Sequence, residues 1–316
     1  MTLESVTSAP AVARDTDFGR AIAQLARNAS IETSTRNLAD VAGYAPLLAP
    51  GTDVYVTFLP GTPYHHILSV ATRLRQAGLN PVPHLAARRF ASAAAVADFA
   101  ARLRDEAGVT RVLLIAGDSQ TACGPFGSSL EVLETGVFQS CGIRSIGIAG
   151  YPEGHPGIPQ QALDDALERK IRYAGTHGLE LFIVSQFCFD GQRVLDWVTR
   201  LRERGVSLPV RVGVAGPATV RTLLSYSIRC GIGASMKALG SRPVSLTRLL
   251  ARHGPEQLAS TVARPAAALG IAGLHLFPFG GFAESARWIA DVAAGRFGLD
   301  ERGKTIELPA VNRAAG

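Results

Sequence analysis

The stretch Val112-Leu-Leu-Ile-Ala-Gly117 is a short apolar run that ends at Asp118. A similar run, Leu181-Phe-Ile-Val-Ser185, ends at Gln186, and a third leads into Tyr151-Pro-Glu-Gly-His-Pro156. An α/β barrel builds its site in this way, because the carboxyl ends of its parallel strands share one rim. The three runs therefore predict buried strands whose ends carry functional groups.

The same pattern continues along the chain on both sides of these runs. Eight short apolar or β-branched segments predict strands, at Ala29–Thr33, Asp53–Phe58, Pro81–Leu85, Arg111–Ala116, Ser145–Ala149, Leu181–Ser185, Pro209–Val214 and Ala272–Leu276. Apolar residues spaced by three and four predict helices between them, at His66–Ala77, Ser92–Asp105, Leu130–Ser140, Gln161–Ala174, Val194–Arg204 and Thr219–Ser227. Strict alternation of this kind favours an α/β fold with a parallel sheet, and eight units predict a closed (β/α)8 TIM barrel. An open, doubly wound sheet is the alternative.

The predicted barrel is a single domain over residues 16–300. Residues 1–15 are expected to form a flexible N-terminal tail, and residues 301–316 a polar C-terminal tail. The longest connection lies between strands seven and eight, where extra helices are expected around Pro243–Arg252 and Pro255–Ala268. A final amphipathic helix is expected over 283–293.

Composition excludes several classes of protein. Hydrophobic residues make up 47% of the chain, yet no apolar run approaches the roughly 20 residues that span a bilayer, so no membrane segment is expected. The first residues lack the pattern of a secretion signal, which predicts a cytoplasmic protein. The net charge of +6 comes mainly from dispersed arginines, so an anionic small ligand is a better expectation than nucleic acid. Four widely spaced cysteines without a CxxC pair predict neither a zinc site nor disulfides.

The predicted strand ends bring a set of polar side chains to one rim: Glu32, Thr57, His84, Asp118, Tyr151, His155 and Gln186. Burial would raise the pKa of Glu32 and make it a proton donor near neutral pH. The alternative for Glu32 is an outward-facing strand residue paired with a helix cation. Asp118 follows a glycine, where a helix cap or an Asx turn is the common structural role.

The remaining rim residues allow more than one role. His84 and His155 could carry protons, donate hydrogen bonds or be structural, and their spacing does not support a metal site. Gln186 would present a donor and an acceptor together, which suits the edge of a pteridine or flavin. Phe277 follows the eighth strand and either packs in the core or lines the rim.

Taken together, these positions resemble the methylenetetrahydrofolate reductase family over roughly residues 30–276. The motifs that carry the resemblance occur in the family's order: Pro83-His-Leu85, Gly117-Asp118, Tyr151-Pro-Glu-Gly-His-Pro156 and Ser185-Gln-Phe-Cys-Phe-Asp190. The resemblance implies a flavin-carrying (β/α)8 barrel that transfers hydride from NADH or NADPH through FAD to 5,10-methylenetetrahydrofolate, or the reverse in one-carbon catabolism. It also implies a homo-oligomer.

The resemblance assigns roles by position. Glu32 matches the general acid that protonates N10 of the folate and so opens a reactive iminium. Asp118 matches a carboxylate beside flavin and pterin that stabilises this cation. Gln186 matches a glutamine that contacts folate and flavin. Phe277 is a second expected substrate contact, on the ground of its place after the eighth strand and not of the resemblance. Flavin contacts are implied for Thr57, His84, Gly117, Asp118, Tyr151, His155, Asp164 and Lys170.

Departures from the family pattern leave alternatives open. Ala116 stands where the family usually has an arginine before Gly117-Asp118, which removes a cation from the cofactor wall. One alternative is a folate reductase that uses NAD(P)H directly without flavin, and another is a folate- or flavin-binding barrel without catalysis. A barrel aldolase would need a Schiff-base lysine at a strand end, whereas Lys170 and Lys237 fall in helices or loops.

Overall fold

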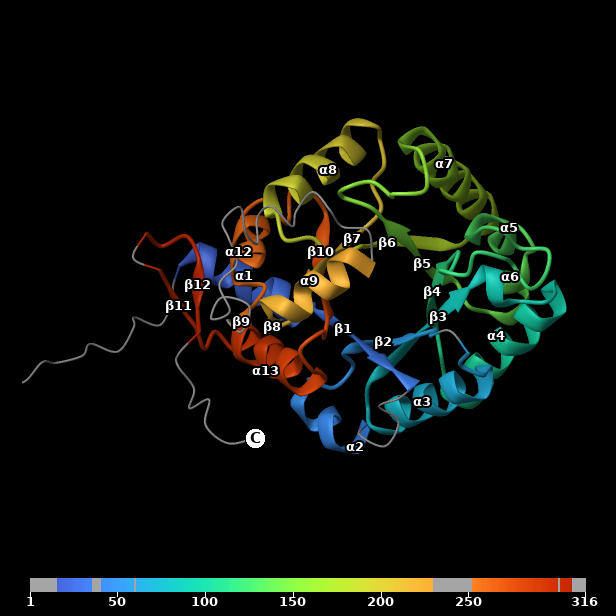
Figure 1. Cartoon of the computed structure of the whole chain (residues 1–316), viewed down its shortest axis with the longest axis horizontal. Helices are drawn as coiled ribbons and strands as arrows, with labels where there is room; N and C mark the ends of the chain where they lie inside the picture. The colour runs from blue at the N-terminus through green and yellow to red at the C-terminus, as the bar shows by residue number, and fades with distance from the viewer. Residues whose placement is uncertain (1–15, 36–40, 60, 230–251, 301, 309–316) are drawn as a thin grey trace, which may run out of the picture.

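Eight parallel strands close into a barrel surrounded by helices in the computed structural model, which describes residues 16–35, 41–59, 61–229, 252–300 and 302–308 (Figure 1). The barrel strands are β1 (Ser30–Ser34), β2 (Asp53–Thr57), β3 (Asn80–Ala86), β4 (Arg111–Ile115), β5 (Ser145–Gly150), β6 (Glu180–Ser185), β7 (Val210–Ala215) and β10 (Ile271–Phe277). Because β1 pairs in parallel with both β2 and β10, the sheet has no free edge. The predicted TIM barrel is confirmed, and the open doubly wound sheet is wrong.

Helices precede, separate and follow the strands, and most of them form an outer ring around the barrel. They are α1 (Asp17–Arg27), α2 (Val41–Tyr44), α3 (Tyr64–Gln76), α4 (Ala93–Ala107), α5 (Ser129–Leu133), α6 (Val137–Cys141), α7 (Gln160–His177), α8 (Gly191–Glu203), α9 (Val220–Arg229), α12 (Glu256–Ala263) and α13 (Phe282–Ala293). Two short 3-10 turns, η3 (Ala45–Leu47) and η4 (Ala87–Arg89), precede β2 and α4. None of the helices in the described part of the chain is both long and apolar enough to cross a membrane.

Local sequence signals explain where several helices begin and end. The Ser92 hydroxyl caps α4 by accepting from the Ala95 amide at 3.2 Å. The Asp190 carboxylate caps α8 by accepting from the amides of Gln192 and Arg193. Gly108 ends α4 in the left-handed conformation, with φ of 59°, which glycine adopts without steric cost. These caps fix the loops that connect the helices to the strand ends.

The structure corrects the predicted elements in four places. The helix expected over 130–140 is broken into α5 and α6, because Gly136 adopts φ of 76° between them. The helix α1, which leads into β1, was not predicted. In the connection between β7 and β10, α12 is shorter than the predicted helix. Arg252, the expected last residue of the other helix, instead begins the short strand β9 (Arg252–His253), which pairs with β8 (Ala218–Thr219). The rest of the helix expected over 243–252 lies outside the described residues.

The end of the described chain also differs from the expected polar tail. Strand β11 (Gly298–Leu299) pairs with β12 (Ile306–Glu307) in an antiparallel hairpin. The Ile306 side chain is buried, and its amide donates to the Ser260 hydroxyl on α12 at 3.0 Å. Ile306 is therefore packed against the barrel, whereas Glu307 is exposed.

The core has two layers. The larger one lies between the strands and the helices. The smaller one fills the barrel interior with Tyr55, Val82, Leu113 and Val184. Toward the amino ends of the strands, the interior closes with an ion cluster in which the Asp53 carboxylate accepts from Arg111 at 2.7 Å and from Arg211 at 2.9 Å.

At the carboxyl ends, β6 and β7 approach each other closely. A Cβ on Gly213 would lie 2.3 Å from the carbonyl oxygen of Ser185, so only glycine fits there. An aromatic cluster covers this side of the rim: Phe187, Phe189, Tyr226, Phe277 and Phe279. Tyr226 belongs to α9, which lies inside the ring of outer helices in Figure 1.

Candidate active site

Glu32 lies on β1 with its side chain inside the barrel, only 14% exposed. Its carboxyl oxygen Oε1 is 3.3 Å from Nε2 of His275 on β10 and 3.5 Å from Nε2 of His84 on β3. The predicted proton donor is therefore held between two imidazoles. The alternative in which Glu32 faces outward to a helix cation is wrong.

His275 is anchored on its other side by the strand that carries Glu32. Its Nδ1 is 2.9 Å from the hydroxyl of Ser30, two residues before Glu32 on the same face of β1. If the Ser30 hydroxyl donates to Nδ1, Nε2 carries the ring proton and donates to Glu32, and the opposite tautomer reverses both bonds. Either way, Ser30 fixes the orientation of the ring toward the acid.

Burial decides which of these three groups holds a proton. It raises the pKa of Glu32 to about 7, an effect that the neighbouring His84 partly offsets. It lowers the pKa of His84 to about 4, and that of His275 to about 3 with a further contribution from Arg211. Both imidazoles are therefore neutral near pH 7, and Glu32 titrates there. Glu32 therefore shares a hydrogen bond with His275, and His84 lies beside it without a hydrogen bond to the carboxyl group.

His275 was missing from the set predicted from sequence, although a signal was present. It shares the inward face of β10 with Gly273 and Phe277, because alternate strand residues face the same side. His275 lies two positions before the predicted rim residue Phe277, just as Tyr55 lies two positions before Thr57. A prediction based on strand ends alone misses this layer beneath the rim.

Asp118 lies on the loop after β4 and is exposed. The preceding Gly117 has φ of 89°, and a Cβ there would meet Ala86 Cβ at 3.1 Å, so glycine is required at this turn. No hydrogen bond or ion pair joins Asp118 to Glu32 in the part of the chain that the structure describes. The role of Asp118 beside a bound folate stays a prediction.

Arg88 on η4 organises the loop that carries Asp118. Its guanidinium donates to the carbonyl oxygens of Ser119 at 3.0 Å and Gly127 at 2.8 Å. Arg88 also contributes to lowering the pKa of His155, after the larger effect of burial. The Arg88 guanidinium therefore places a cation beside the loop that carries Asp118.

The Tyr151 motif forms the next part of the rim. The Tyr151 and His155 rings meet edge to face with centroids 5.2 Å apart, and burial raises the pKa of the tyrosine. His155 Nδ1 accepts from the Gly157 amide at 3.1 Å. Thr57, at the end of β2, donates its hydroxyl to the Thr33 carbonyl at 3.0 Å. These predicted cofactor contacts lie at the carboxyl ends of strands.

A small cavity of about 70 Å³ lies between α7 and the barrel wall and is lined in part by Tyr151, Asp164 and Lys170. Burial lowers the pKa of Lys170 to about 8, and the described residues provide no ion-pair partner for it. The Asp164 carboxylate, in contrast, is paired with Arg204 at 2.6 Å. The structure thus brings three predicted cofactor residues to one cavity and leaves only Lys170 with an unneutralised charge.

The two predicted substrate contacts lie on the aromatic side of the rim. Gln186 Oε1 accepts from the Phe187 amide at 3.1 Å. Phe277 meets the His275 ring edge to face with centroids 4.9 Å apart and the Phe187 ring at 5.5 Å. The aromatic cluster therefore continues directly into the Glu32 group through His275.

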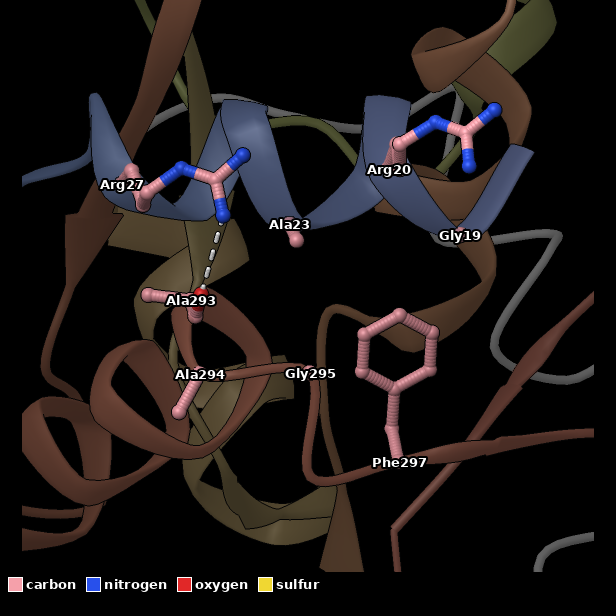
Figure 2. Close-up of a pocket in the computed structure, with 8 residues that line it drawn as sticks. All are labelled: Gly19, Arg20, Ala23, Arg27, Ala293, Ala294, Gly295 and Phe297. Atoms are coloured by element: carbon pink, nitrogen blue, oxygen red, sulfur yellow. Dashed lines mark hydrogen bonds between the residues drawn. The ribbon is translucent and has the colours of Figure 1, made fainter. Parts of the chain in front are cut away.

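A larger cavity of about 240 Å³ lies away from this rim, between α1 and the end of α13 (Figure 2). Its two arginines already have partners, since Arg20 pairs with Asp17 and Arg27 donates to Gln24 and to the Ala293 carbonyl. Within the described ranges, no group of three or more His, Cys, Asp or Glu side chains is arranged to hold a metal ion.

The sequence model of the family described as methylenetetrahydrofolate reductase matches residues 32–226, more than half of the chain. The chain belongs to the methylenetetrahydrofolate reductase family. The matched range begins at the acid Glu32 and includes the Gly117-Asp118, Tyr151 and Gln186 motifs. It ends before His275 and Phe277.

Individual relatives match over shorter ranges. Methylenetetrahydrofolate reductase 2 of Saccharomyces cerevisiae is 32% identical over 83 residues, which are 25% of this chain and 13% of that protein. Methylenetetrahydrofolate reductase 1 of Schizosaccharomyces pombe is 32% identical over 69 residues, 22% of this chain and 11% of that protein. These matches therefore span only a small part of the two yeast proteins.

Two solved structures match this chain at low sequence identity. A dihydropteroate synthase (FolP) from Thermus thermophilus is 12% identical with a TM-score of 0.44, and the match covers 83% of this chain and 90% of that one. A 3-dehydroquinate dehydratase from Aquifex aeolicus is 8% identical with a TM-score of 0.45, and the match covers 84% and 96%. Likeness at this level says nothing about substrate.

Proposed function

We propose that this protein is a methylenetetrahydrofolate reductase that moves a hydride between NAD(P)H and the one-carbon unit of 5,10-methylenetetrahydrofolate, with FAD as the carrier. The forward reaction gives 5-methyltetrahydrofolate, and the reverse would serve one-carbon catabolism. The observation that carries the proposal is a buried carboxyl group, Glu32, with its pKa near 7 and two neutral imidazoles beside it.

The chemistry of the substrate explains why such an acid is needed. A methylene bridge between two nitrogens accepts hydride poorly until one nitrogen is protonated and the ring opens to a cation. A general acid works best when its pKa lies near the operating pH, which is the condition that burial creates at Glu32. In the proposed reaction, Glu32 donates a proton to N10, and Asp118 stabilises the cation that results.

The residues around Glu32 would control this proton. Ser30 and His275 hold the acid in place, and the neutral His84 cannot compete with Glu32 for a proton near pH 7. Gln186 would hydrogen-bond the pterin, and Phe277 with Phe187 would provide an apolar face for its ring. Exclusion of water by these rings would protect the cation from hydrolysis.

The residues at the other side of the rim fit a phosphate-bearing flavin. Lys170 is a half-buried cation with no ion-pair partner among the described residues, and such a charge is stabilised by an anionic ligand. Thr57, Gly117, Tyr151, His155 and Lys170 would hold the cofactor, together with Asp164 if its pairing with Arg204 allows. When bound, the flavin would supply a carrier that takes hydride from one substrate and gives it to the next.

The test is to purify the protein and record its visible spectrum under nitrogen, before and after NADH or NADPH and then methylenetetrahydrofolate. A yellow protein that bleaches with the nicotinamide and recovers its colour with the folate supports the proposal. A colourless protein that oxidises NAD(P)H with the folate would replace FAD with direct hydride transfer. Binding of folate without turnover would leave only a binding barrel.

The Glu32→Gln variant then separates the two half-reactions. It should retain flavin reduction by NAD(P)H and lose folate reduction, because only the second step needs a proton donor. Glu203→Gln, an exposed position on α8, is the matched control and should retain both. Loss of both half-reactions in the Glu32 variant would remove it from the acid role.

A further inference from the structure

Two loops at the carboxyl end of the barrel are joined by a pair of side chains to which the proposed function gives no role. The loop after β5 carries Tyr151, Glu153 and His155, and the loop after β6 carries Gln186 and Cys188. The Cys188 thiol donates to Oε1 of the half-buried Glu153 at 3.1 Å. The two loops are therefore in direct side-chain contact.

Cys188 is a fixed point on its own side of this contact. Its side chain is buried, and its amide donates to the carbonyl oxygen of Gly213 on β7 at 3.3 Å. The sulfur also accepts from the amide of Asp190 at 3.4 Å, and Asp190 caps α8. A carboxylate that accepts from this thiol is therefore held relative to β7 and α8, and not only relative to a loop.

The thiol keeps its proton, which the contact requires. Burial raises the pKa of Cys188 to about 12, so the sulfur is protonated at neutral pH. Two acceptors compete for this one proton, the Glu153 carboxylate at 3.1 Å and the Asp190 carbonyl oxygen at 3.3 Å. A charged acceptor forms the stronger hydrogen bond, which makes Glu153 the preferred partner.

The contact connects the two kinds of ligand contact expected at the rim. Glu153 lies between Tyr151 and His155, which are predicted to bind the flavin and whose rings meet edge to face. Cys188 lies two residues after Gln186, which is predicted to bind the folate. A change in the separation of the two loops would therefore displace one ligand relative to the other.

We infer that Cys188 and Glu153 are positioning residues, whose hydrogen bond keeps the two loops at the separation that places flavin and folate in contact. This role rests on the proposed function, because it requires both ligands in one site. Reactions between two bound molecules depend steeply on their placement, and an error of about 1 Å can lower a rate about 100-fold. A bond between the loops reduces such errors before either ligand binds.

The experiment is a double-mutant cycle on the whole protein, with the dissociation constant of FAD and the KM for methylenetetrahydrofolate measured for each variant. Cys188→Ala removes the donor and should raise both constants about tenfold, the effect expected for one hydrogen bond. Glu153→Ala should raise both to the same extent. The double variant should add little to either change, because both substitutions remove the same contact.

Two further variants separate positioning from a general loss of packing. Cys188→Ser retains a donor and should restore both constants to near the wild-type values. Cys141→Ala is the matched control, because it removes another buried thiol, on α6, which donates only to the Phe138 carbonyl of its own helix. A Cys188→Ala protein that is less stable in urea but keeps both constants would overturn the inference. Additive effects in the double variant would also overturn it.

Infrared spectroscopy tests the contact in the protein without ligands. The S–H stretching band of Cys188 is assigned by its loss in Cys188→Ala. It should move to higher frequency in Glu153→Ala, because the remaining acceptor, the Asp190 carbonyl oxygen, is neutral and farther away. A band that does not move overturns the inference. A wild-type protein that binds neither FAD nor folate contradicts the proposed function, and a shifted band would then show a contact that has no ligand to position.

Discussion

Replacement of Glu32 by glutamine should change how the stability of the protein depends on pH. The folded-state pKa of Glu32 is raised from an ordinary value of 4.5 to about 7. Between these values the folded protein holds a proton that the unfolded chain has released, so unfolding becomes easier as pH rises. The glutamine variant has no proton to lose at this position, and its stability should not fall in this window.

The size of the effect follows from the same two pKa values. At about 1.4 kcal/mol for each tenfold change in proton affinity, the wild-type protein should lose about 3 kcal/mol relative to the variant between pH 4.5 and pH 7. The side chain is only 14% exposed, so solvent screening reduces this value little. His84 and His275 titrate mainly below this range in the folded state, and their contributions are present in both proteins.

The assay is urea unfolding of wild type and Glu32→Gln at several pH values between 5 and 8, with the midpoint and the slope reported for each. The difference in unfolding free energy should grow with pH and level off above about pH 7. Glu203→Gln, which changes an exposed side chain, should give a constant difference. Parallel pH profiles for wild type and Glu32→Gln would refute the idea of a buried, neutral acid at this position.

Two further predictions concern charges elsewhere in the barrel. Asp53→Asn should lower the free energy of unfolding in urea by about 3–5 kcal/mol, because it leaves Arg111 and Arg211 without their carboxylate. The control is Glu134→Gln, which breaks the surface pair with Arg169 and should cost less than about 1 kcal/mol. Similar losses in both variants would show that Asp53 is not a buried counter-charge. Lys170→Met should stabilise the cofactor-free protein by roughly 2 kcal/mol at pH 7, because it removes a desolvated cation. The same variant should weaken FAD binding about tenfold in a fluorescence titration, because the anionic cofactor loses a positive partner. A loss of stability would mean that the lysine has a partner.

The barrel could be predicted from sequence because each of its strands is a short, nearly continuous apolar run between amphipathic helices. All eight predicted strands are present, and their ends lie within about one residue of the predicted ones. The helix over 130–140 was predicted as continuous because its apolar spacing is regular on both sides of Gly136. The left-handed conformation of that glycine depends on packing, which local spacing does not encode.

The acid of the site could be predicted, but most of its surroundings could not. Glu32 stood out because a carboxylate within an apolar strand is costly unless its environment is specialised. Its closest partner, His275, is 243 residues away in sequence and meets it only because β10 closes the barrel beside β1. His84 was predicted at the rim as a cofactor contact, whereas the structure places its ring against Glu32. The contacts of Glu32 with His275 and His84 depend on how the strands are aligned when the barrel closes, and this alignment cannot be read from the local sequence.

The order of proton affinities inside the barrel follows from its charge distribution. In water a histidine binds a proton more tightly than a glutamate does, but here the pKa values are about 7 for Glu32, about 4 for His84 and about 3 for His275. Burial penalises every charged form, and it therefore shifts an acid upward and a base downward. Arg211, held at the amino end by Asp53, further disfavours a positive charge on His275. Arg211 thus helps to keep His275 neutral and the proton on Glu32, and Asp53 offsets part of this effect.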